Sequence, residues 1–392
     1  MLTLLADRMK ELGTETAFEM LAKAKKLEAE GKEIIHLEIG EPDFPTPSNV
    51  IEQGCKSLRA GLTKYTPSAG LLETRQVIAD YIGRTRGYTV NPDEVVVTAG
   101  GKPIIFYTIL AFINPGDEVI YPNPGFPIYE SVINFAGGIP VPIPLREENH
   151  FRMDIDELKS LISDKTKMLI INSPQNPTGG VLTKEDLQSI AELLADRDIV
   201  ILSDEIYDNI VYDQDAYSIT SFPGMREKTI ILNGFSKTYA MTGWRIGYGV
   251  MPKEIAVHIA KLVTNSTSCL AGFTQMAAIE ALTGDQGEVK RRVEQFRIRR
   301  DRIVEGLNEI PGIKCLKPAG TFYVFPNVKQ FGMSSSKIAD YLLYEAGVAT
   351  LGGNSFGIYG EGYLRLSYAN SLDNIEIALE RIKKALNKLK RL

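Results

Sequence analysis

Apolar residues recur at helical spacing in the first part of the chain. Residues 14–31 predict an amphipathic helix, because apolar side chains return every three or four positions. Those side chains are Ala17, Met20, Leu21, Ala24 and Leu27. The same periodicity predicts helices over Ile51–Leu62 and Leu71–Arg86, and three prolines between residues 42 and 47 predict extended chain before them.

Seven short apolar runs, separated by helical segments, follow in the next part of the chain. They are Glu94–Thr98, Glu118–Tyr121, Ile139–Ile143, Lys167–Ile171, Ile199–Leu202, Thr229–Leu232 and Ile246–Val250. Apolar strands that alternate with helices are typical of a mostly parallel sheet covered on both faces. Pro140 and Pro142 interrupt the third run, which predicts that it lies at an edge of the sheet.

The pattern changes near Gly284. A charged helix is predicted over Glu288–Ile310, followed by strand-like runs at Thr321–Phe325 and Gly362–Ser367 and by a basic terminal helix. These elements predict a smaller α+β domain after the sheet.

This order of elements predicts an α/β fold in three parts. Residues 46–284 would form the large domain with the seven-stranded sheet, and residues 285–392 the small domain. Residues 1–45 precede the sheet and need a surface to pack on, so we expect them to join the small domain.

The amino-acid composition argues against several classes of protein. Of the 392 residues, 44% are hydrophobic and 24% are charged, values typical of globular proteins and not of disordered or collagen-like chains. The net charge is −5, so the chain lacks the basic surface expected of a nucleic-acid-binding protein. No apolar run approaches the roughly 18 residues that span a bilayer, and residues 1–10 do not have the pattern of a signal peptide. We expect a cytoplasmic protein that binds neither nucleic acid nor membranes.

Cysteine and histidine are rare and scattered. The positions are Cys55, Cys269, Cys315, His36, His150 and His258. No two cysteines form a CxxC pair, so we expect reduced thiols, as in a cytoplasmic protein. The scatter also predicts that the chain has no metal site and no histidine-based catalytic triad.

Polar residues cluster just after several predicted strands, where ligands bind in open α/β sheets. Ser236 and Lys237 follow the sixth run, and Arg245 lies a little further on. A lysine at the end of a buried strand is unusual, and a desolvated lysine has a lowered pKa that suits Schiff-base chemistry. A hydroxyl and a guanidinium beside it suit a phosphate. Taken alone, Lys237 also fits a solvated loop lysine.

Asp204 and Tyr207 follow the fifth run. A carboxylate at a buried strand end needs a cationic partner. Pyridoxal phosphate offers one, since an aspartate that keeps the pyridine nitrogen protonated makes the ring an electron sink. Taken alone, Asp204 is also typical of a helix N-cap, and Tyr207 of a core aromatic.

Two loops supply further polar groups. Asn176 lies in a Pro/Gly-rich loop after the fourth run, where its amide would bond the cofactor phenolic oxygen and the substrate carboxylate. Gly101 and Lys102 follow the first run and open a helix, so their backbone N–H groups would approach a phosphate. Taken alone, the first loop is a turn, and the second is a glycine pair that matches neither the dinucleotide nor the P-loop fingerprint.

In their order along the chain, these motifs resemble those of the fold-type I, pyridoxal-phosphate-dependent class I/II aminotransferases. The likeness runs from about Glu15 to the C-terminus and is greatest to prokaryotic aspartate aminotransferases and their broad-specificity relatives. The resemblance implies a large cofactor-binding domain, a small domain, and a homodimer with active sites at the subunit interface.

The resemblance also assigns cofactor contacts. Lys237 would form the Schiff base with pyridoxal 5'-phosphate and move the proton between Cα and the cofactor. Asp204 would pair with the pyridine nitrogen, and Asn176 and Tyr207 would hydrogen-bond the phenolic oxygen. The phosphate contacts would be the backbone amides of Gly101 and Lys102, the side chains of Ser236 and Arg245, and Tyr65 of the partner subunit.

Substrate contacts follow from the same resemblance. Phe126 lies where the family stacks an aromatic ring on the cofactor. Arg365 would clamp the substrate α-carboxylate as a bidentate pair, and the backbone of Gly40 would line the same carboxylate.

Four positions bear on the substrate class. Many aspartate aminotransferases carry tryptophan where this chain has Phe126, which weakens the case for strict dicarboxylate preference. Lys102 stands where related enzymes carry a lysine that meets the distal carboxylate. Thr16 lies in the matching N-terminal segment, beside Glu15, whose charge would repel acids. We expect transamination of an aspartate- or glutamate-type amino acid with a 2-oxo acid such as 2-oxoglutarate. The alternative is a broad-specificity enzyme for neutral or aromatic amino acids, of the alanine, aromatic or kynurenine type.

Other classes stay open as alternatives. A pyridoxal-phosphate β-lyase or decarboxylase would use much of the same machinery, because the cofactor carries the chemistry. A ligand sensor on this fold would carry an added DNA-binding domain, for which we expect no room before Glu15 or after Asn370. A nicotinamide dehydrogenase is disfavoured by the missing glycine fingerprint.

Overall fold

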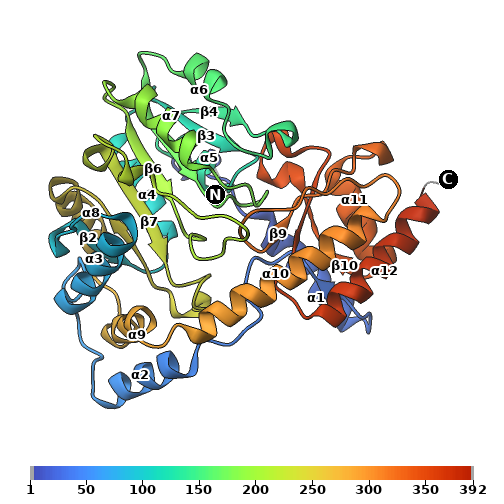
Figure 1. Cartoon of the computed structure of the whole chain (residues 1–392), viewed down its shortest axis with the longest axis horizontal. Helices are drawn as coiled ribbons and strands as arrows, with labels where there is room; N and C mark the ends of the chain where they lie inside the picture. The colour runs from blue at the N-terminus through green and yellow to red at the C-terminus, as the bar shows by residue number, and fades with distance from the viewer. Residues whose placement is uncertain (1–3, 390–392) are drawn as a thin grey trace.

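The computed structural model describes residues 4–389, and its largest element is a seven-stranded sheet (Figure 1). The strand order is β2-β8-β7-β6-β5-β3-β4, and neighbours are parallel except that β8 is antiparallel to both β2 and β7. The bounds are β2 Val95–Thr98, β3 Glu118–Asn123, β4 Ile139–Pro144, β5 Thr166–Asn172, β6 Val200–Asp204, β7 Thr229–Gly234 and β8 Gly247–Val250. The expected α/β fold with a mostly parallel sheet is confirmed, and the proline-containing strand β4 lies at an edge, as predicted.

Helices cover both faces of this sheet, because neighbouring residues of a strand point to opposite sides. Met168 and Ile170 of β5 pack in one apolar cluster with α4, α5 and α8, whereas Leu169 and Ile171 pack in another with α7. A third cluster joins β2 and β8 to α3 and α9. The bounds are α2 Ser48–Arg59, α3 Leu72–Arg86, α4 Lys102–Phe112, α5 Ile128–Phe135, α6 Ile155–Leu161, α7 Lys184–Leu194, α8 Lys253–Ser266 and α9 Gly272–Thr283.

Some helices and strands begin or end at other residues than predicted. Helix α2 runs over Ser48–Arg59 and not over residues 51–62, because Gly61 adopts a φ of 78° just beyond its end. The polar residues Asn172 and Asp204 are themselves the last residues of β5 and β6, and they pair with each other across the ladder. Backbone pairing therefore continues past the point where the apolar pattern stops.

A second region is built around a three-stranded antiparallel sheet in the order β11-β12-β9. The N-terminal strand β1 pairs in parallel with β10, so the start of the chain packs on this region. Helix α10 runs from the side of α2 and α9 to that of α12 (Figure 1). The bounds are α1 Thr16–Ala29, β1 Ile35–His36, α10 Gly287–Asn308, β9 Tyr323–Val324, α11 Ser335–Tyr341, β10 Val348–Ala349, β11 Leu351–Gly352, β12 Leu364–Ser367 and α12 Leu372–Leu389. The expected domain limits stay a prediction, since one apolar cluster continues from β5 through α10 to α12.

One edge of the large sheet gathers the predicted motifs. The carboxyl ends of β2, β5, β6 and β7 meet there, and β8 runs the opposite way, so Arg245, which precedes it, reaches the same edge. At Gly100 φ is 93°, and a Cβ would lie 2.3 Å from Arg245 Nη2. Only glycine permits this approach of the loop to the guanidinium. Across residues 4–389, no helix has the length and apolar character needed to cross a membrane.

Candidate active site

A pocket of about 570 Å³ opens at this sheet edge, between the strand ends and side chains of the second region. Its size suits a small ligand. The predicted site residues in its lining are Gly40, Gly101, Lys102, Phe126, Asn176, Asp204, Tyr207, Ser236, Lys237, Arg245 and Arg365. Two predicted residues are not in this lining: Thr16, which lies between the lining residues Glu15 and Ala17, and Tyr65, which is 91% exposed.

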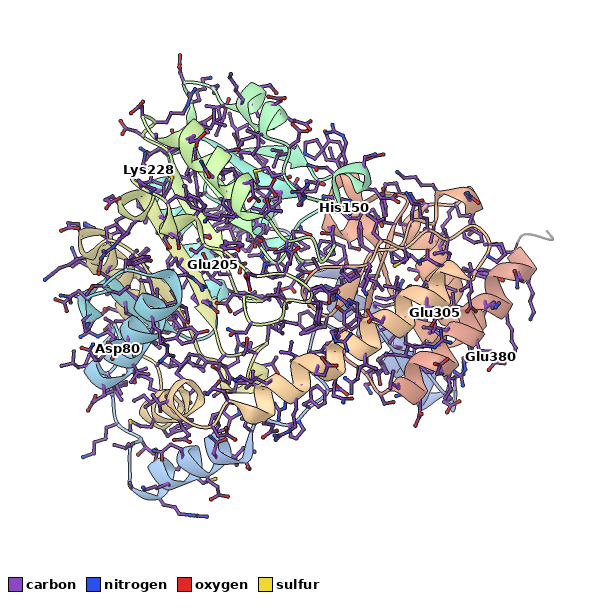
Figure 2. All side chains as sticks on the ribbon, in the orientation of Figure 1. Asp80, His150, Glu205, Lys228, Glu305 and Glu380 are labelled. Carbon is purple, nitrogen blue, oxygen red and sulfur yellow. The ribbon has the colours of Figure 1, made fainter. Side chains whose placement is uncertain are left out.

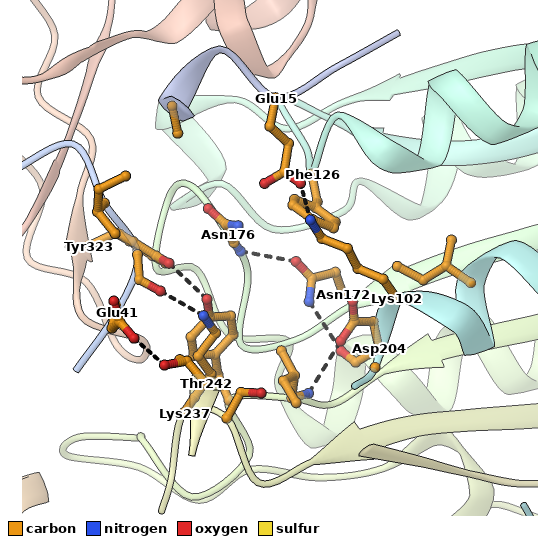
Figure 3. A pocket seen from close by; sticks show the side chains of 18 of the residues that line it. Glu15, Glu41, Lys102, Phe126, Asn172, Asn176, Asp204, Lys237, Thr242 and Tyr323 are labelled. Atoms are coloured by element: carbon orange, nitrogen blue, oxygen red, sulfur yellow. Dashed lines mark hydrogen bonds and ion pairs between the residues drawn. The ribbon is translucent and has the colours of Figure 1, made fainter. Parts of the chain in front are cut away.

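Lys237 follows β7 and lies in the pocket (Figure 3). Its Nζ donates a hydrogen bond to the Gly40 carbonyl at 2.6 Å. Burial, together with the positive charge of Arg365, lowers the pKa of Lys237 to about 8. About a tenth of the amine is therefore neutral and nucleophilic at pH 7, far more than for an ordinary lysine.

Asp204 is buried at the end of β6. Tyr129 Oη donates to its Oδ2 at 2.6 Å, and the Ile206 backbone N–H donates to its Oδ1 at 3.2 Å. Burial raises the pKa of Asp204 to about 6, against the effect of the Tyr129 hydrogen bond. Both partners are uncharged, and a buried carboxylate is costly without a cation, so the site suits a ligand that carries positive charge.

Asn176 and Tyr207 are buried in the same part of the pocket. The Asn176 side-chain oxygen accepts from Arg365 Nη1 at 3.2 Å, which leaves its amide N–H groups as donors for a ligand. Tyr207 shares a 2.8 Å hydrogen bond with Tyr323, from β9 in the second region. Burial raises the pKa of Tyr207 well above its usual value, so its hydroxyl stays protonated.

Arg365 lies on β12 with its guanidinium between two aromatic rings. Its Cζ is 4.5 Å from the ring centroid of Tyr323 and 4.8 Å from that of Phe356. Its hydrogen-bond acceptors are the Asn176 side-chain oxygen and the Glu38 carbonyl, both uncharged. Its buried Nε has no hydrogen-bond partner among residues 4–389. The planar fork is therefore available to a carboxylate.

The start of α4 forms a second position for an anion. The first N–H groups of a helix lack intrahelical partners and attract anions, and α4 begins at Lys102 after a glycine pair. The Arg245 guanidinium is held beside them by hydrogen bonds of 2.8 and 3.2 Å to two backbone carbonyls. Ser236 lines the same pocket. These groups together suit a phosphate.

A buried ion-pair network holds the turn that carries Asp204 and Tyr207. Arg86, at the end of α3, pairs with Glu205 at 2.6 Å and with Asp208 at 2.7 Å. Figure 2 shows Glu205 in the part of the chain that contains the seven-stranded sheet. Removing one partner of a buried pair costs about 3–5 kcal/mol, so this network fixes the backbone from which both functional side chains extend.

Lys102 and Phe126 lie together on one side of the pocket (Figure 3). The Lys102 Nζ is 5.6 Å from the Phe126 ring centroid, and it forms an ion pair with the Glu15 carboxylate. The Phe126 ring also contacts Tyr129 edge-on, with 5.8 Å between the centroids. This side of the pocket therefore presents both an aromatic surface and a neutralised cation.

Two contributors to the site were not predicted from the sequence. Tyr129 orients Asp204, and it follows Phe126 by one helical turn, a spacing that could have indicated it. Tyr323 bonds Tyr207 and also explains Gly40, because a Cβ there would lie 2.0 Å from the Tyr323 hydroxyl. Tyr323 comes from a distant strand, and no local pattern points to it.

The family model described as aminotransferase class I and II matches residues 32–382. The chain belongs to this family. An aspartate aminotransferase from Pyrococcus abyssi is 41% identical to it, over 92% of this chain and 93% of the relative. Aromatic-amino-acid aminotransferase 2 from Thermococcus litoralis is 39% identical, over 98% of this chain and 99% of the relative. A solved structure of aspartate aminotransferase from Thermus thermophilus with maleate has a TM-score of 0.93 and 38% identity, covering 97% of this chain and 99% of that one.

These comparisons confirm the expected fold-type I aminotransferase architecture. They also confirm the expected activity, since the aminotransferase family and the named relatives support transamination between an amino acid and a 2-oxo acid. The relatives carry both aspartate and aromatic names. The identity of this aminotransferase's substrate must therefore be argued from its pocket.

Proposed function

We propose that this aminotransferase uses pyridoxal 5'-phosphate, bound through Lys237, to transfer amino groups between an aspartate- or glutamate-type amino acid and a 2-oxo acid such as 2-oxoglutarate. The strongest support for this proposal comes from two residues of one pocket. Asp204 is buried there with only uncharged hydrogen-bond partners, and Lys237 has a lowered pKa. The carboxylate needs a cation and the amine needs an electrophilic carbonyl. Pyridoxal phosphate offers both on one ring.

The other polar groups of the pocket fit the rest of this cofactor. The α4 N-terminus, Ser236 and Arg245 suit its phosphate. The Asn176 amide and the Tyr207 hydroxyl are donors suited to its phenolic oxygen. Phe126 supplies an aromatic face for stacking on the ring.

When bound, the cofactor supplies a sink for the electrons released as the Cα–H bond of the amino acid breaks. Asp204 would keep the pyridine nitrogen protonated by accepting a hydrogen bond from it. The Lys237 Nζ would accept the proton from Cα of the amino acid and return it to the cofactor carbon that is bonded to the transferred nitrogen. Arg365 and the Gly40 backbone bind the α-carboxylate and orient the amino acid toward that amine.

Replacing Arg365 by lysine should impair every substrate. Arg365→Lys keeps the charge but loses the planar fork, so kcat/KM should fall about 10- to 100-fold for aspartate and for alanine alike. Steady-state kinetics of both substrates measure the effect, with Arg84→Lys on exposed helix surface as the matched control. A loss confined to aspartate would contradict the α-carboxylate role.

A second candidate is a broad-specificity aminotransferase for neutral or aromatic amino acids. The observations that favour it are the Glu15–Lys102 ion pair and the aromatic surface of Phe126. The deciding experiment is a panel of amino acids with 2-oxoglutarate or pyruvate, in which each half-reaction is followed by cofactor absorbance. The highest kcat/KM with aspartate or glutamate would support the main proposal, and the highest with alanine or an aromatic amino acid the second.

We also propose a homodimer in which Tyr65 reaches the phosphate site of the partner subunit. Tyr65 is 91% exposed, and Leu58, Leu62 and Leu72, which are close to it in the sequence, are also exposed. Exposed large apolar side chains in one segment favour an interaction surface there. Light scattering at assay concentration should give twice the 43.4 kDa chain mass, and an active monomer would rule the arrangement out. Cytoplasmic localisation stays a prediction.

A further inference from the structure

Lys102 differs from the other cations of the pocket in having a carboxylate partner. The lining contains four cationic side chains, Lys102, Lys237, Arg245 and Arg365. Lys237 and Arg245 donate to backbone carbonyls, and Arg365 to a carbonyl and an amide oxygen. Lys102 is paired with Glu15. Arg245 and Arg365 are therefore open to anionic groups of the cofactor and substrate, Lys237 is kept for covalent attachment, and Lys102 is neutralised from within the chain.

The Glu15–Lys102 pair can open without unfolding either helix. Glu15 immediately precedes α1 and forms no side-chain capping bond to it, and Lys102 begins α4. The Glu15 side chain is 19% exposed and that of Lys102 47%, so water reaches the pair. Partly exposed ion pairs contribute little net stability. A competing carboxylate can therefore take the place of Glu15.

Apolar side chains lie beside this pair. The Lys102 Nζ is 5.6 Å from the Phe126 ring centroid. Phe18, one helical turn after Glu15, also lines the pocket and is 60% exposed. A substrate side chain here meets aromatic surface while the pair is closed, and meets a free ammonium group once Glu15 has moved away.

We propose that Glu15 is an exchangeable counter-ion of Lys102 and sets the side-chain specificity of the pocket. The inference rests on the proposed function, the transamination of aspartate- or glutamate-type amino acids, and adds that Lys102 receives their distal carboxylate. Apolar substrates leave the pair closed and pack against Phe126. Dicarboxylic substrates displace Glu15, and their distal carboxylate takes over its bond to Lys102. Glu15 thereby lowers the preference for dicarboxylic substrates and allows both classes to use one pocket in turn.

The test measures binding without turnover. Cofactor-loaded enzyme is titrated calorimetrically with maleate, a dicarboxylate, and with hydrocinnamate, an aromatic monocarboxylate. Neither probe carries an amino group. In Glu15→Gln the Kd for maleate should fall about tenfold, because the substrate carboxylate no longer competes for a charge-assisted hydrogen bond. The Kd for hydrocinnamate should stay within about twofold. Glu19→Gln, an exposed position on the same helix, is the matched control and should behave as wild type.

The double variant Glu15→Gln/Lys102→Ala locates the effect. It should lose the gain in maleate affinity, because that gain depends on Lys102 and the effects of substitutions at two contacting residues do not simply add. An unchanged maleate Kd in Glu15→Gln, an equal gain for both probes, or a gain that persists without the lysine would overturn the inference. Wild-type kinetics decide the proposed function separately. If the wild-type enzyme does not transaminate aspartate but Glu15→Gln still binds maleate more tightly, the proposed substrate class fails and the role of Glu15 stands.

Discussion

Lys237→Ala is expected to reduce transamination by at least about 10⁴-fold, because one amine supplies both the covalent link and the general base. The other contacts proposed for the cofactor, at Arg245, Asn176 and Asp204, stay in place, so the variant should still bind it non-covalently. Rates of each half-reaction, followed by cofactor absorbance, measure the loss. Lys261→Ala, at an exposed position on α8, is the matched control and should retain full activity. Wild-type rates in Lys237→Ala would contradict the account.

The pH dependence of cofactor attachment follows from the same amine. Burial and the charge of Arg365 lower the pKa of Lys237 to about 8, and the neutral form is the nucleophile. The rate at which enzyme stripped of cofactor takes up pyridoxal phosphate should therefore rise about tenfold per pH unit below pH 8 and level off above it. A rise that continues toward the ordinary lysine pKa would show that the amine is not desolvated.

Asp204→Asn is expected to produce the second large loss, in kcat more than in cofactor affinity. The substitution keeps the shape of the side chain but removes the charge that holds the ring nitrogen protonated. Breaking a buried charge pair costs about 3–5 kcal/mol, which corresponds to about 10²- to 10⁴-fold in kcat. Steady-state kinetics at saturating cofactor measure it, with the exposed Asp156→Asn as control. An unchanged kcat would show that Asp204 has only a structural role.

Much of the fold was predictable because the sheet is buried on both faces. The runs that became β2 to β8 are mostly apolar, and Pro140 and Pro142 correctly placed β4 at an edge. Strand ends were less predictable. Asp204 belongs to β6 because its backbone pairs with Asn172, and the pattern of apolar residues does not reveal such backbone pairing.

The candidate site was likewise only partly predictable from the sequence. Residues that follow strands of one sheet, such as Asn176 and Lys237, could be placed together because parallel strands end at one edge. Tyr323 comes from the second region and reaches the pocket through packing that no local pattern describes. The Glu15–Lys102 pair joins two residues that are 87 positions apart in the chain. The sequence could suggest that Glu15 repels acids, but not that it binds this lysine.

The proposed function requires pyridoxal phosphate to bind covalently to Lys237. The most direct measurement is borohydride reduction of the cofactor-loaded enzyme, followed by digestion and peptide mass spectrometry. We expect a reduced cofactor adduct on the peptide that contains Lys237, located on that side chain and absent from Lys237→Ala. An unmodified Lys237, or an adduct located on another lysine such as Lys102, would contradict this expectation.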